Sequence, residues 1–192
     1  MAAQNTPRPD KKKITLTGKT RFLTTSAMIA AMYVALSAVS QAVGLCSGAV
    51  QCRLSEALCV LPVFTAAAIP GVTVGCLITN ILFGLGPLDV ILGTVATLIA
   101  ALVCRALRKL PYIASVPTIL ANALIVPLVL IYYKFSSGYL ADAGLVALGE
   151  IIACGVLGTV LVWYLLTHPK TAAKLGGAAI EDHPASAPQE NR

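Results

Sequence analysis

The stretch VQCRLSEALCV, residues 50–60, places an arginine and a glutamate three positions apart between long hydrophobic runs. Charged groups are costly in lipid, so ionisable side chains inside a membrane usually face a bundle interior or a watery cavity and serve a function. Arg53 and Glu56 are therefore the first candidates for a binding site. One alternative is a structural ion pair. Another is that Glu56, directly after Ser55, stabilises the positive end of a helix dipole.

The composition of the chain predicts a membrane protein. Its 192 residues are 57% hydrophobic and only 11% charged, and the mean hydropathy is +0.83. A soluble domain cannot hide that much apolar surface from water. A span needs about 20 residues, so there is room for about six spans in one domain. The net charge of +6 does not indicate nucleic acid, because the basic residues crowd at the ends of apolar runs, as in cytoplasmic loops.

The apolar runs predict an all-α bundle of six transmembrane helices, over residues 22–44, 55–69, 71–85, 88–107, 113–133 and 143–166. The second and third runs are short, and the IPG at residues 69–71 predicts a turn between them. A single broken helix is the alternative, but it would move the basic RALRK segment to the outer face. The positive-inside rule therefore favours six helices. With six helices, only Arg53 and Lys134 lie outside among the assigned basic residues. Both termini are then cytoplasmic, with disordered tails at residues 1–21 and 167–192.

Three acidic residues from different helices are expected at one depth. The rise of about 1.5 Å per residue puts Glu56, Asp89 and Glu150 roughly 20–24 Å above the inner ends. Asn80 and Asn122 are expected nearer the midplane. These residues predict an outward-facing pocket for a small polar ligand, cationic ligands included. Asp89 alternatively stabilises the first turn of its helix, and the two amides alternatively bond neighbouring helices.

A stripe of small residues runs along the first helix. Ala27, Ala31 and Ala35 are four residues apart, which gives a smooth face for close helix approach. Docking to another protein and ordinary internal packing are both open at this point.

Other kinds of chemistry find no support in the sequence. The six cysteines contain no C-x-x-C and are expected as buried thiols, although Cys46 and Cys52 flank one loop and form a possible pair. Both histidines lie in the C-terminal tail, so no metal site is expected. No phosphate-binding loop is present, so the chain cannot power transport by ATP hydrolysis alone. Neither a cofactor nor an enzymatic activity is expected, since no nucleophile and base have a recognisable spacing.

The polar segments together resemble the QueT family of predicted queuosine-precursor transporters. The likeness extends from about Thr25 to Leu166. It includes QCRLSEALCVLP, the run IPGVTVGCLITNILFGLGPLDVILGTVATLIAAL, then NALIV and ALGEIIACGVLG. Its most specific part is the R-x-S-E-A pattern from Arg53 to Ala57.

This resemblance implies a substrate-binding S component of an energy-coupling factor (ECF) transporter in the cell membrane. Such components are six-helix proteins that pair with a transmembrane coupling subunit and two cytoplasmic ATPases, and the alanine-rich face of helix 1 is their usual docking surface. The implied ligand is a 7-deazaguanine precursor of queuosine, such as preQ1 or preQ0. Alternatives are another vitamin or nucleobase, a solitary secondary transporter, or a structural membrane scaffold.

Overall fold

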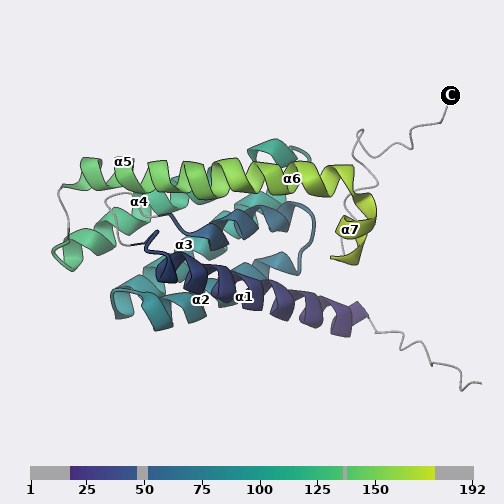
Figure 1. Cartoon of the computed structure of the whole chain (residues 1–192), viewed down its shortest axis with the longest axis horizontal. Coiled ribbons are helices and arrows are strands. Elements are labelled where there is room, and N and C mark those ends of the chain that lie inside the picture. The colour runs from purple at the N-terminus through teal and green to yellow at the C-terminus, as the bar shows by residue number, and fades with distance from the viewer. Residues whose placement is uncertain (1–17, 47–51, 136–137, 176–192) are drawn as a thin grey trace, which may run out of the picture.

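The computed structural model describes residues 18–46, 52–135 and 138–175, and every regular element in these ranges is helical (Figure 1). The elements follow in this order: α1 (Gly18–Ala42), η1 (Leu54–Val63), α2 (Ala68–Phe83), α3 (Pro87–Ala106), η2 (Pro111–Ile113), α4 (Val116–Tyr132), α5 (Tyr139–Glu150), η3 (Ile151–Leu157), α6 (Gly158–Thr167) and α7 (Pro169–Lys174). Four stretches are long and apolar enough to span a bilayer: Gly18–Ala42, Pro87–Ala106, Pro111–Tyr132 and Tyr139–Thr167. Leu54–Val63 and Ala68–Phe83 are apolar but shorter.

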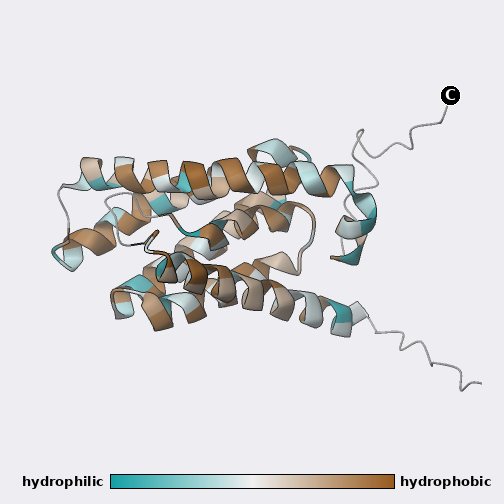
Figure 2. Cartoon of the chain, viewed as in Figure 1, coloured by the Kyte–Doolittle hydropathy of each residue, from teal (hydrophilic) through white to brown (hydrophobic). Residues whose placement is uncertain are grey.

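The outer surface of the bundle is apolar along most of its length. Hydrophobic residues cover the long helices, and hydrophilic residues gather at helix ends and on α7 (Figure 2). Large side chains such as Ile91, Leu120 and Val160 are more than half exposed. In water such a surface would aggregate, whereas in a bilayer it faces lipid at no cost. The predicted all-α, multi-pass membrane protein is thus confirmed, with four long helices established by length and composition.

The centre of the bundle is occupied by η1, a 3₁₀ helix. It packs against α1, α2, α3, η3 and α6, and eight of its ten residues are buried. A helix surrounded on all sides has no lipid-facing stripe, which explains why this short segment is buried and mostly apolar, with Ser55 and Glu56 as its polar residues. Arg105 of α3 donates to the carbonyl oxygens of Pro62 and Val63 at 3.2 and 3.1 Å. This bond satisfies carbonyls left free where η1 ends.

Two glycines bring α2 close to α1. A Cβ on Gly71 would lie 2.9 Å from Cβ of Ile29, and one on Gly75 would lie 2.7 Å from Cβ of Tyr33. Any larger residue would push the helices apart, as in other small-xxx-small helix pairs. Tyr33, which is fully buried, can therefore reach across to η1.

Several predicted boundaries differ from the structure. The second and third apolar runs do separate, but the break lies at residues 64–67. Pro70 and Gly71 belong to the first turn of α2, where a proline is tolerated because that N–H has no helical partner. Helix α1 begins at Gly18, inside the predicted N-terminal tail. The predicted C-terminal tail is likewise wrong up to residue 174, because α7 forms there; the remaining tail residues lie outside the described ranges.

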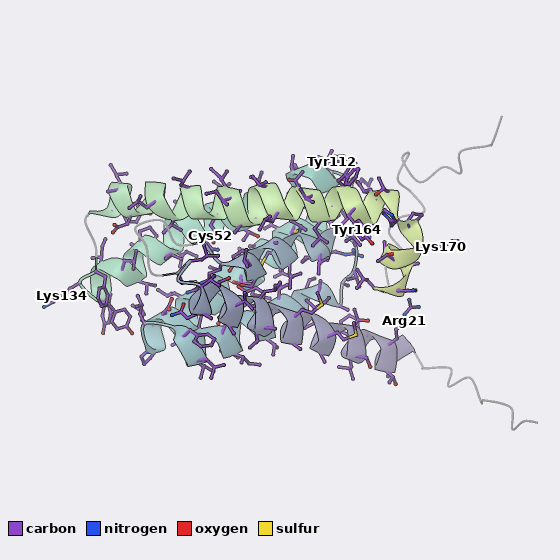
Figure 3. All side chains as sticks on the ribbon, in the orientation of Figure 1. Arg21, Cys52, Tyr112, Lys134, Tyr164 and Lys170 are labelled. Atoms are coloured by element: carbon purple, nitrogen blue, oxygen red, sulfur yellow. The ribbon has the colours of Figure 1, made fainter. Side chains whose placement is uncertain are left out.

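The first and last described helices meet at one end of the bundle. Arg21 of α1 donates to the Ala173 carbonyl of α7, and Ala172 of α7 is fully buried. Arg21 and Lys170 lie at this end and Lys134 at the other (Figure 3). The two ends of the described chain therefore lie at the same end of the bundle.

Candidate functional site

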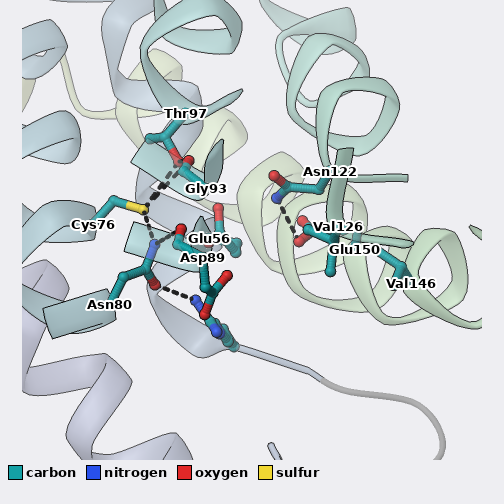
Figure 4. A pocket seen from close by; sticks show the side chains of 11 residues that line it. Glu56, Cys76, Asn80, Asp89, Gly93, Thr97, Asn122, Val126, Val146 and Glu150 are labelled. Carbon is teal, nitrogen blue, oxygen red and sulfur yellow. Dashed lines mark hydrogen bonds between the residues drawn. The ribbon is translucent and has the colours of Figure 1, made fainter. Parts of the chain in front are cut away.

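The six predicted binding residues line one cavity. It measures about 50 Å³, which is room for about four water molecules. Its lining residues come from η1 and its N-terminal flank and from α2, α3, α4 and α5: Arg53, Glu56, Cys76, Asn80, Asp89, Gly93, Thr97, Asn122, Val126, Val146 and Glu150. Figure 4 shows two groups of polar side chains facing each other across it. The site thus lies between two walls, one from η1, α2 and α3 and the other from α4 and α5.

The cavity lies in the half of the bundle away from the meeting termini. Arg53 directly precedes η1, Asn80 lies in the last turn of α2, and Asp89 lies in the first turn of α3. These three helix ends are at the end of the bundle opposite Gly18, because consecutive helices alternate in direction.

Arg53 is held by an amide and not by the nearby glutamate. Its Nη1 donates to Oδ1 of Asn80 at 3.0 Å, and the amide nitrogen of Asn80 lies 3.5 Å from the Asp89 carbonyl oxygen. Asn80 was expected deeper than the charged groups, but this direct contact puts it at their level. The close fit depends on Gly93, where a Cβ would approach the Asn80 nitrogen to 2.6 Å.

Glu56 is anchored by the protein on both of its oxygens. Tyr33 donates its hydroxyl to Oε1 at 2.5 Å, and the Cys59 thiol contacts Oε2 at 3.2 Å. Only 3% of the residue is exposed. The carboxylate therefore has little capacity left for a guest, and its bonds tie α1 to η1.

The hydrogen bond of Asp89 supports the alternative interpretation that this residue stabilises the turn at the start of its helix. Its Oδ2 accepts from the backbone N–H of Leu85 at 3.0 Å, closing the turn that precedes α3. The carboxylate also lines the cavity. The two roles are compatible, because one oxygen is sufficient for the turn.

The α4–α5 wall is less completely bonded. Asn122 donates to Oε1 of Glu150 at 2.7 Å, so this amide too lies level with its acid. The other oxygen, Oε2, is buried and has no hydrogen-bond partner. A buried acceptor without a donor costs about 1–3 kcal/mol, and more when it is charged. Directly after Glu150 the chain forms the π-helical segment η3, a distortion that is frequent at functional sites.

The sequence analysis missed five lining residues and one supporting residue. Cys76, Gly93, Thr97, Val126 and Val146 each lie four positions from another lining residue on the same helix. Stepping one helical turn from each polar candidate would have found four of them, and a second turn from Asp89 would have found Thr97. Tyr33, the partner of Glu56, could not be found in this way, because it lies on α1, which carries none of the polar candidates.

The alanine stripe of α1 lies outside the cavity. Ala27, Ala31 and Ala35 are all exposed on the face of α1 that points away from η1 and α2. Internal packing is therefore not their role within this chain. Close packing against α2 uses Ile29 and Tyr33 instead.

Cys46 and Cys52 are free thiols close to the site. The Cys46 sulfur lies 3.9 Å from the Cys52 carbonyl oxygen. Partial burial raises the pKa of both thiols, and the negative charge of Glu150 raises that of Cys52 further. Cys52 is thus near enough to the α4–α5 wall to sense its charge.

A bundle of apolar helices around a buried polar cavity is the architecture of a multi-pass membrane transport protein. The QueT transporter family matches residues 23–167, most of the chain, and the protein belongs to this family. This membership makes it a transporter component, as the R-x-S-E-A segment indicated. Searches of curated proteins and of solved structures found no match.

Proposed function

We propose that this protein is the S component of an ECF-type importer and binds a 7-deazaguanine precursor of queuosine. The main observation in support is the convergence of six polar residues, from five separate parts of the chain, on one cavity. Keeping carboxylates, amides and a guanidinium away from water is costly unless a guest completes their hydrogen bonds. A guanine-like edge offers N–H donors to carboxylates and carbonyl acceptors to Arg53. Binding without chemical conversion is sufficient for this role.

The topology follows from the same proposal. Six spans put the cavity in the outer half of the membrane and both termini in the cytoplasm. The shorter η1 and α2 are tolerated because η1 is enclosed by other helices, and short spans are also accommodated by local thinning of the bilayer. Arg21 and Lys170 then lie on the cytoplasmic side, as the positive-inside rule requires.

Binding a bicyclic base has to widen the cavity. The present space of about 50 Å³ holds a few water molecules, and a deazaguanine is several times larger. The α4–α5 wall is the better candidate for movement. Its Asn122–Glu150 bond lies within the wall itself, and no hydrogen bond in the described ranges joins the lining residues of this wall to those of the other wall.

Binding by the purified protein is the direct test. We expect 7-deazaguanines to raise the thermal stability of the protein in detergent, with guanine and unrelated vitamins giving smaller shifts. A larger shift from another vitamin would favour the second candidate, an S component with a different cargo. Uptake that persists without any ATPase partner would instead indicate a secondary transporter.

The exposed α1 face provides a separate test of coupling. We propose that Ala27, Ala31 and Ala35 dock the transmembrane coupling subunit, which in turn binds two ATPases. Ala31→Leu should abolish co-purification with that subunit and leave ligand binding intact. Ala141→Leu, at an exposed alanine of α5, is the matched control and should assemble normally. Normal assembly of Ala31→Leu would remove this face from the interface.

A further inference from the structure

The charges around the cavity do not balance. Three carboxylates, Glu56, Asp89 and Glu150, line it together with one guanidinium, Arg53. With all four ionised, the cavity carries an excess of two negative charges. In a low-dielectric interior such an excess is compensated by bound protons or by a cationic guest.

The unmatched acceptor is on one particular residue. Both oxygens of Glu56 have protein partners, and Asp89 accepts from the backbone of Leu85. Oε2 of Glu150 is buried without any partner, while its Oε1 is fixed by Asn122. The amide therefore holds the carboxylate in place and leaves one oxygen available. That oxygen belongs to the wall that contains no positive charge among its lining residues.

The substituent on the deazaguanine ring determines whether a ligand can donate a hydrogen bond to Oε2 of Glu150. An aminomethyl group carries an ammonium with three N–H donors and a positive charge, and a charge-assisted bond to a carboxylate is about twice as strong as a neutral one. A nitrile is uncharged, and its nitrogen only accepts. Facing Glu150, a nitrile would leave the carboxylate unpaired.

We infer that the cavity selects a 7-deazaguanine bearing an ammonium group over its uncharged nitrile counterpart, and that Glu150 is the residue that determines this selection. The inference rests on the proposed function, because it presumes a deazaguanine guest. In the bound state Oε2 of Glu150 accepts from the ammonium and Asn122 orients the carboxylate. The ring edge is left to Arg53 and the η1–α2–α3 wall.

The test compares two ligands on two proteins. Isothermal titration of 7-aminomethyl-7-deazaguanine and 7-cyano-7-deazaguanine is carried out on the wild type and on Glu150→Gln, in the same detergent. The wild type should bind the aminomethyl ligand at least about tenfold more tightly. Glu150→Gln should lose about that factor for the aminomethyl ligand. It should bind the nitrile ligand at least as tightly as the wild type does, because the Gln amide can donate to the nitrile nitrogen.

Each other outcome has a definite meaning. Equal wild-type affinities, or a preference that survives Glu150→Gln, would overturn the inference and leave the proposed function standing. If the wild type binds neither ligand, the proposed function itself fails. If Glu150→Gln does not fold, the wild-type preference decides alone, and its absence overturns the inference.

Discussion

The two walls of the cavity differ in how many hydrogen bonds they provide to their carboxylates. In the η1–α2–α3 wall, Glu56 has a donor on each oxygen and Asn80 links Arg53 to α3. In the α4–α5 wall, Glu150 has one donor and one orphan oxygen. The first wall is therefore built to hold the fold together, and the second is left incomplete. The difference teaches that two buried acids lining one cavity can differ in how many of their hydrogen bonds the protein itself fills.

Removal of the Tyr33 side chain should have the largest effect on stability. Tyr33→Ala deletes a fully buried ring and should lower the free energy of unfolding by about 3–5 kcal/mol. Tyr33→Phe keeps the ring but leaves Oε1 of Glu56 without its donor, so we expect a loss of about 1–3 kcal/mol. Denaturant titration in mixed micelles measures both. If Tyr33→Phe has the same free energy of unfolding as the wild type, the η1–α2–α3 wall does not depend on this hydrogen bond.

A methyl group at Gly93 should have an intermediate effect. The Cβ of Gly93→Ala would approach the Asn80 nitrogen to 2.6 Å, so the amide must shift away from Arg53. We expect a loss of about 1–3 kcal/mol, as for other overpacked sites, together with weaker ligand binding. Gly144→Ala is the control, because nothing lies within 4 Å of a Cβ at that position. A Gly93→Ala protein as stable as the control would show that the wall is loosely packed.

Neutralising Glu150 should have the smallest effect on stability. Gln keeps an acceptor for Asn122 and removes an uncompensated buried charge, but it puts an unpaired amide nitrogen in place of Oε2, so the gain and the loss largely offset each other. We expect the free energy of unfolding to stay within about 0.5 kcal/mol of the wild type. Thermal unfolding without ligand checks this. A loss as large as that of Tyr33→Ala would erase the distinction between the two walls.

Much of the site was predictable because polar residues are rare in an apolar chain. Arg53, Glu56, Asn80, Asp89, Asn122 and Glu150 stand out against their neighbours for that reason, and helix counting gave the three acids a common depth. The depth of the two amides was wrong. For Asn80 the reason is that helix counting began at the Pro-Gly turn, whereas the actual break lies three to six residues before Pro70 and places Asn80 in the last turn of α2.

The sequence by itself determined that the chain is a helical membrane protein with a buried polar site, because hydropathy and the cost of charge in lipid act on each residue separately. Only the tertiary structure decided which acid is satisfied and which is not. That distinction depends on Tyr33 and Asn122 reaching across from other helices, and on Gly75 letting Tyr33 approach. Such contacts join residues far apart in the chain, so no local pattern records them.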